Sequence, residues 1–146
     1  MRLPEWLSSS GAITGSVAAA AFTLIHAFNA LPLRADWSPS PEPKPWQQRR
    51  QSLLPGDGWR FVDATSTDQF EAGEYIRRPR TVGDSVELDA GLILKKADQT
   101  EWSARVVPMR AVCLQDRLER KDANGVWTPY PGRAGTAVRV RWICSL

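Results

Sequence analysis

Residues 113–144 read CLQDRLERKDANGVWTPYPGRAGTAVRVRWIC and begin and end on the only two cysteines of the chain. Within this stretch, Asn124-Gly125 lies between two runs of β-strand character, and Asn-Gly is a strong signal for a tight hairpin. Apolar and basic side chains then alternate through residues 138–142, which would place them on opposite faces of a strand. The stretch predicts an antiparallel β unit whose last strand, residues 137–144, closes the sheet.

The two cysteines, Cys113 and Cys144, can either be bonded to each other or remain two buried thiols. Both end strand-like runs, and an apolar segment with the character of an export signal precedes them, which favours a bridge. In the chain-entropy model, a bridge over such a loop would stabilise the fold by roughly 3–4 kcal/mol. We therefore predict a Cys113–Cys144 disulfide.

Length and composition limit the classes of function. The 146 residues suffice for one domain behind an N-terminal segment, with 42% apolar and 24% charged residues. A net charge of +3, without a basic patch or a known motif, gives no reason to expect nucleic acid as a partner. The single histidine, His26, lies in an apolar run, which argues against zinc clusters and Ser-His triads. The aspartates have the spacing of turn formers. We predict a non-enzymatic protein with no metal, cofactor or identified small-molecule substrate.

The N-terminal segment, residues 1–33, contains a run without formal charge from residue 11 to residue 33. About 20 apolar residues span a bilayer, whereas a signal peptide needs an apolar run of roughly 7–15 residues and a small-x-small cleavage site. The run is longer than that, and its cleavage sites are poor. A single transmembrane helix is favoured over a cleaved signal peptide or a buried hairpin helix.

One face of this expected helix carries small and polar residues. Small residues let two helix backbones approach closely, and polar side chains in a bilayer prefer protein partners to lipid. The face indicates packing against other subunits of a membrane protein complex, within membrane lipid. Its residues are Gly11, Gly15, Ala18, Phe22, His26 and Asn29.

Residues 34–58 contain alternating prolines from Pro39 to Pro45, which predicts an extended, Pro-rich linker in polyproline II conformation. Basic residues after the apolar run favour a cytoplasmic location for the C-terminal part of the chain, whereas the cysteines favour an oxidising compartment. Giving the cysteines more weight, we expect a single-pass membrane protein with its β domain on the periplasmic or lumenal side.

Residues 59–146 are predicted to form an antiparallel β domain without a helix. Gly91 suggests a bulge and Pro108 a bulge or an edge position. Short strands at this spacing are typical of a small antiparallel sheet, sandwich or barrel. The expected strands are residues 59–63, 74–78, 85–95, 102–114, 114–121, 126–130 and 137–144.

The same part of the chain carries landmarks of a known family. An apolar strand runs into Cys113, Trp127 precedes a Thr-Pro-Tyr-Pro-Gly segment, and the last strand-like run ends on Cys144. Trp59 and the residues 61–66 after it are similar to that family's opening strand and turn. The domain thus resembles the surface-adhesin protein E-like family of small exported β proteins, many of them cyanobacterial. The resemblance implies an antiparallel β domain, export and a cysteine pair, and it brings no established active site.

A basic cluster surrounds Pro79 and consists of Arg77, Arg78 and Arg80. It is either a solvated loop or a docking site for an acidic partner or phospholipid headgroups.

These observations lead to two hypotheses of function. The favoured one is an accessory subunit of a membrane complex, whose β domain caps the exported side. The family resemblance makes a photosynthetic (thylakoid) membrane a plausible home. The alternative is an exported adhesin-like or ligand-binding β domain that its N-terminus only delivers.

Overall fold

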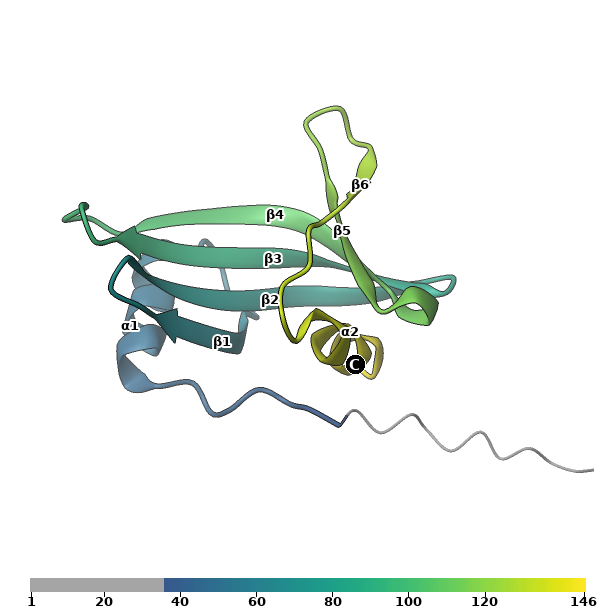
Figure 1. Ribbon diagram of the computed structural model, residues 1–146, viewed down its shortest axis with the longest axis horizontal. Helices are drawn as coiled ribbons and strands as arrows, with labels where there is room; N and C mark the ends of the chain where they lie inside the picture. Colours follow the sequence, from purple (N-terminus) through teal and green to yellow (C-terminus); the bar gives the residue numbers. More distant parts are fainter. Residues whose placement is uncertain (1–35) are drawn as a thin grey trace, which may run out of the picture.

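The computed structural model describes residues 36–146 as an open six-stranded antiparallel sheet with one α-helix on each face (Figure 1). Each strand pairs with the next one along the chain, so the order is β1-β2-β3-β4-β5-β6. The prediction of a mainly β, antiparallel domain is confirmed. The elements are α1 (Lys44–Leu53), β1 (Arg60–Ser66), β2 (Phe70–Val82), β3 (Ser85–Lys96), β4 (Ser103–Val112), the 3-10 turn η1 (Cys113–Gln115), β5 (Arg117–Lys121), β6 (Trp127–Pro129) and α2 (Thr136–Cys144).

The expected transmembrane helix or signal, residues 1–33, lies outside the described residues. So does its proposed packing face of Gly11, Gly15, Ala18, Phe22, His26 and Asn29. Among residues 36–146, no helix has both the length and the apolar character that crossing a membrane requires.

The hairpin predicted around Asn124-Gly125 is confirmed and joins β5 to β6. The Asp122 carboxylate accepts hydrogen bonds from the backbone N–H groups of Asn124 (2.8 Å) and Val126 (2.9 Å). Gly125 has a φ of 78°, a left-handed conformation that glycine adopts without steric cost. Local turn chemistry therefore decided this element.

The strand expected at residues 137–144 is wrong, because this segment forms helix α2. Its apolar residues fit both periods: Val138 and Val140 are two apart, whereas the buried Val140 and Ile143 are three apart. Gly135, with a φ of 83°, directs the chain into the helix. The segment is helical because a helix lets both Val140 and Ile143 pack against the sheet. The β propensity of the local sequence did not indicate this packing.

The prediction of an extended spacer is wrong for residues 44–53, which form α1. Pro43 precedes the helix and Pro45 lies in its first turn, where proline is tolerated because the missing N–H has no partner within the helix. Trp46 on this helix and Leu54 after it are buried against the sheet. The folded unit thus begins well before Trp59.

Two further strand predictions need correction. β2 does not stop at Pro79 but continues to Val82, with a register shift between Arg77 and Arg80 that absorbs the proline. Gly91 makes no bulge, because its pairing with both neighbouring strands is regular. A Cβ there would lie 2.9 Å from the Trp59 ring, so this glycine provides room for an aromatic side chain.

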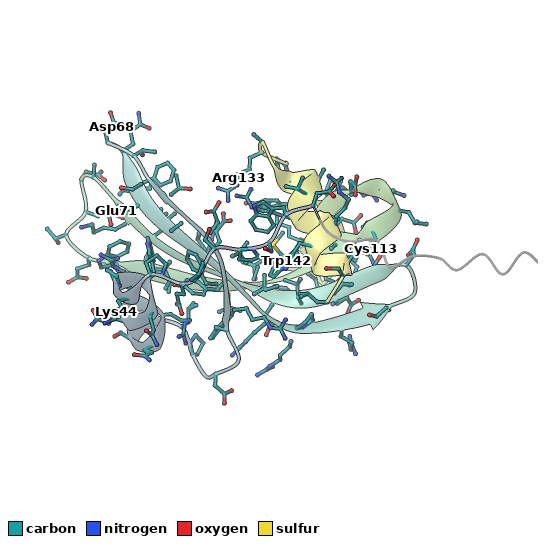
Figure 2. All side chains as sticks on the ribbon, turned by 90° about the horizontal axis from the view of Figure 1, so that it is seen from below. Lys44, Asp68, Glu71, Cys113, Arg133 and Trp142 are labelled. Carbon is teal, nitrogen blue, oxygen red and sulfur yellow. A yellow bond between two sulfur atoms is a disulfide. The ribbon has the colours of Figure 1, made fainter. Side chains whose placement is uncertain are left out.

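The sheet has two separate cores, one under each helix (Figure 2). Trp46, Leu54, Trp59, Tyr75 and Ile93 pack on the α1 side. The α2 side contains Val62, Ile76, Val86, Leu88, Met109, Ala111, Val140 and Ile143. The predicted disulfide is present: Cys113 in η1 bonds Cys144 at the end of α2, with 5.9 Å between the two Cα atoms. It links the C-terminal helix to the sheet.

Candidate functional site

A cavity lies on the α2 side of the sheet, with a volume of about 170 Å³. Helix α2 covers one end of this face, and the segment that joins β6 to α2 passes over the strands (Figure 1). The interior of the cavity is apolar because side chains at alternate strand positions point to this face. The main apolar lining residues are Val62, Ile76, Leu88, Val107, Met109 and Ile143.

The charged residues of the cavity lining are mostly arginines. Arg105 follows from the alternation of β4, where it lies on the same face as Val107 and Met109. Arg120 of β5 pairs with Met109, so it lies on that face as well. Both arginines are exposed, and within residues 36–146 neither has an ion-pair partner. The cavity therefore has two free guanidinium groups at its β4–β5 side.

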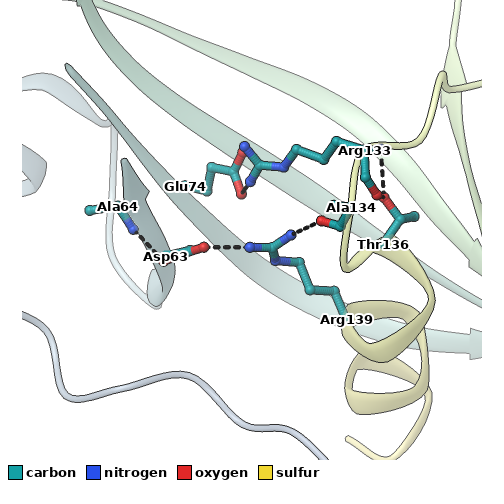
Figure 3. A network of polar contacts seen from close by, with 7 residues as sticks. All are labelled: Asp63, Ala64, Glu74, Arg133, Ala134, Thr136 and Arg139. Atoms are coloured by element: carbon teal, nitrogen blue, oxygen red, sulfur yellow. Dashed lines mark hydrogen bonds and ion pairs between the residues drawn. The ribbon is translucent and has the colours of Figure 1, made fainter. Parts of the chain in front are cut away.

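Two other arginines of the lining bind carboxylates of the sheet (Figure 3). Arg133 donates a hydrogen bond to Glu74 of β2, and Arg139 of α2 donates one to Asp63 of β1. Thr136 accepts a hydrogen bond from the Arg133 backbone N–H (3.0 Å), which caps the turn before α2. These contacts fasten the segment over the cavity to the β1–β2 edge.

Glu74 is the carboxylate in the cavity lining. Burial raises its pKa above the ordinary value of 4.5, and the positive charges of Arg133 and Arg139 offset only part of that effect. The nearby carboxylate of Asp63 adds to the rise in pKa. The Nε atom of Arg139 is buried without a hydrogen-bond partner among the described residues. The polar network therefore contains groups that are only partly compensated.

The basic cluster predicted around Pro79 is mostly engaged within the fold. Arg77 donates hydrogen bonds to Asp89 (3.0 Å) and to the Pro55 carbonyl (2.7 Å), and its guanidinium lies 4.3 Å from the centre of the Trp59 ring. Arg80 pairs with Glu87 at 2.6 Å. Arg78 is the most available of the three, with 75% of its side chain exposed. Docking through this cluster stays a prediction.

The sequence analysis missed the arginines and the glutamate of the cavity: Glu74, Arg105, Arg120, Arg133 and Arg139. The signal for Arg105 was present, because Arg105, Val107 and Met109 alternate along a predicted strand. No local pattern could show that Arg120, from the next strand, shares that face. Arg139 was expected on a strand face and instead projects from a helix.

The geometry favours binding. An apolar interior accepts an apolar group, and free guanidinium groups at its side accept an anion with directed, charge-assisted hydrogen bonds. Within residues 36–146, no group of three or more histidine, cysteine, aspartate or glutamate side chains is arranged to hold a metal ion.

Comparisons with protein-family models, with curated proteins and with solved structures found no match for this chain. The resemblance to the surface-adhesin protein E-like family therefore stays a prediction.

Proposed function

We propose that this chain is an exported, non-enzymatic binding domain whose cavity takes a ligand with an apolar group next to an anionic group. The observation that carries the proposal is the apolar cavity with Arg105 and Arg120 at its side, both without carboxylate partners in the described part of the chain. This corresponds to the ligand-binding alternative of the sequence analysis.

The expected affinity is moderate. Complete burial of an aliphatic group of leucine size contributes about 1.5–3 kcal/mol. A charge-assisted hydrogen bond to one or both guanidinium groups contributes roughly 1.5–3 kcal/mol more. Both arginines are exposed, so salt screens part of their contribution. The ligand must therefore use both the cavity and the arginines.

A role in binding also agrees with the part played by Glu74. Its carboxylate is held by Arg133, so it fixes the segment over the cavity and does not face the ligand as a free base. Export is supported by the Cys113–Cys144 bridge, because disulfides persist mainly in oxidising compartments. The hypothesis of a membrane-complex subunit depends on residues 1–33, which lie outside the described residues, and no observation on residues 36–146 favours it over the binding domain.

The proposal is tested with octanoate, which combines a short apolar chain with a carboxylate. We expect NMR titration of the 15N-labelled protein to shift the amide signals of β4 and β5, and octanamide to bind at least about tenfold more weakly. The double variant Arg105→Gln/Arg120→Gln should bind octanoate more weakly than the wild-type protein by a similar factor. Arg60→Gln removes an exposed arginine from the far edge of the sheet and serves as the matched control, with affinity changed less than about twofold.

Equal binding of octanoate and octanamide, or unchanged binding by the double variant, would contradict the proposal. Val107→Trp adds a second test, because a large ring at this position fills the cavity. This variant should give a dispersed NMR spectrum and no octanoate shifts.

A further inference from the structure

We infer that the natural ligand is an acidic, extended peptide segment that pairs as an added strand with the free edge of β4. The inference rests on the proposed function, since the peptide would place one side chain in the cavity described above. It names the class of partner and the backbone groups that recognise it.

The first step is the free edge itself. β4 spans Ser103–Val112, but its pairing with β5 covers only Met109–Val112. Beyond that point β5 turns away from β4, and among the described residues the first half of β4 has a neighbouring strand only on the β3 side (Figure 1). Residues 103–105 are exposed, as expected for an open edge. An open edge of this kind is a template for another extended chain.

The second step is which backbone groups point outward. The N–H group of Cys113 bonds the carbonyl of Asp84 at 3.2 Å, which places it on the β3 side. Pairing with β3 is regular from Val112 back to Ser103, so N–H groups alternate between the two sides along the strand. Those of Ala104 and Val106 therefore face away from β3. Pro108, which has no N–H, occupies the next outward position, where proline is tolerated.

No hydrogen-bond partner within residues 36–146 is present for the Ala104 and Val106 N–H groups. Both residues belong to a regular strand, so the donors are already held in the geometry of a sheet ladder. An incoming strand would accept hydrogen bonds from them without any rearrangement of β4.

The third step is the side-chain pattern that such a strand would need. A residue opposite Arg105 would lie on the cavity face, and so would the residue opposite Val107, two positions along. Arg105 favours an acidic residue at the first position, and the apolar lining favours an aliphatic residue at the second. Arg120 lies where the added strand would meet β5, and it favours a second carboxylate, including a terminal one.

The size of the cavity supports a peptide side chain over a large ligand. About 170 Å³ holds one aliphatic side chain, whereas pockets for drug-sized molecules measure roughly 300–1,000 Å³. Charge complementarity with two free arginines and the outward donors of β4 thus point to the same occupant.

The test uses a synthetic peptide of about seven residues in which every second residue is aspartate or leucine and the residues between them are threonine. The peptide should bind the oxidised protein and displace octanoate. N-methylation of alternate backbone amides keeps every side chain of the peptide but prevents strand pairing along one of its two edges. The peptide methylated on the edge that faces β4 should bind at least about tenfold more weakly than the unmodified peptide. Replacing aspartate with asparagine should also weaken binding.

On the protein, Ala104→Pro removes one outward donor at an exposed position and leaves the cavity and both arginines in place. It should weaken the peptide at least about tenfold and leave octanoate binding unchanged. If octanoate binds but the peptide does not, or if Ala104→Pro and N-methylation leave peptide binding unchanged, the inference is overturned and the proposed function stands. If neither ligand binds, both fail.

Discussion

The two faces of the sheet are covered by helices of nearly equal length but are built in different ways. On the α1 face, aromatic rings lie directly on the backbone: Trp46 packs on Gly73, and Trp59 packs on Gly91. On the α2 face, the helix is held by the Cys113–Cys144 bridge and by ion pairs at its edges. The α1 face is held mainly by aromatic packing, whereas the α2 face is fastened at a few points and keeps an apolar cavity against the sheet.

We expect this difference to separate residues that determine the stability of the fold from residues that determine the affinity of the proposed ligand. The α1 face adds a buried hydrogen bond from the Tyr75 hydroxyl to the Trp46 carbonyl (3.1 Å), and the Arg49 guanidinium lies 4.2 Å from the centre of the Trp102 ring. These contacts fill the space between α1 and the sheet, and an open hollow remains beside Arg49, Leu53 and Trp102. A face fastened by a covalent link and surface charges can retain open apolar space without losing its helix. Variants on the two faces should therefore differ in which property they change.

The largest effect is expected from the disulfide. Cys144→Ser should lower the free energy of unfolding by about 2–5 kcal/mol, because the bridge restricts the unfolded chain. It should also weaken octanoate binding, since α2 and the segment before it close the cavity. Urea unfolding and NMR titration measure the two effects. Full octanoate affinity in a stable Cys144→Ser variant would show that the bridge does not maintain the cavity.

The second effect concerns the α1 face. A Cβ at Gly73 would lie 2.5 Å from ring atoms of Trp46, so Gly73→Ala should destabilise the protein by about 1–3 kcal/mol through overpacking. Octanoate affinity should not change. In a Trp46→Leu background the same glycine substitution should cost less than about 0.5 kcal/mol, because the ring that it meets is gone. Equal costs in both backgrounds would mean that backbone effects, not the ring, explain the glycine.

Local patterns in the sequence predicted those parts of the fold that local chemistry decides. The Asp122–Gly125 turn, the cysteine pair and the strand predicted at residues 85–95, which the structure has as β3 (Ser85–Lys96), belong to this group. Helix α2 could not be predicted from local patterns, because the helical conformation is favoured only when Val140 and Ile143 can pack against the sheet. Helix α1 was not predicted because prolines near its first turn are equally compatible with an extended spacer.

The candidate site was harder to predict because it is assembled from separate elements. Arg105 and Arg120 share a face only through the register of β4 and β5, and Arg133 reaches Glu74 across 59 positions of the chain. Single-strand alternation can place one of these side chains on a face. It cannot show which charges meet carboxylates and which stay free, and that distinction is what makes the cavity a candidate binding site.

The smallest effect, and the most specific to the α2 face, is a dependence of stability on pH through Glu74. Burial raises its pKa in the folded protein above the ordinary value of 4.5, and Arg133 offsets this only in part. The folded state therefore keeps this proton at higher pH than the unfolded state does. The stabilisation that results is complete below the unfolded pKa and is lost as pH rises through the folded pKa.

Glu74→Gln removes this proton equilibrium and keeps the shape of the side chain. The difference in unfolding free energy, wild type minus Glu74→Gln, should therefore fall as pH rises from about 4 to about 7. Urea unfolding at a series of pH values measures it, with Glu71→Gln on the same strand as the matched control. We expect a modest change, because about a third (32%) of the Glu74 side chain is exposed and solvent screens its charge. A difference that rises with pH would instead mean that pairing with Arg133 outweighs the effect of burial on the pKa of Glu74.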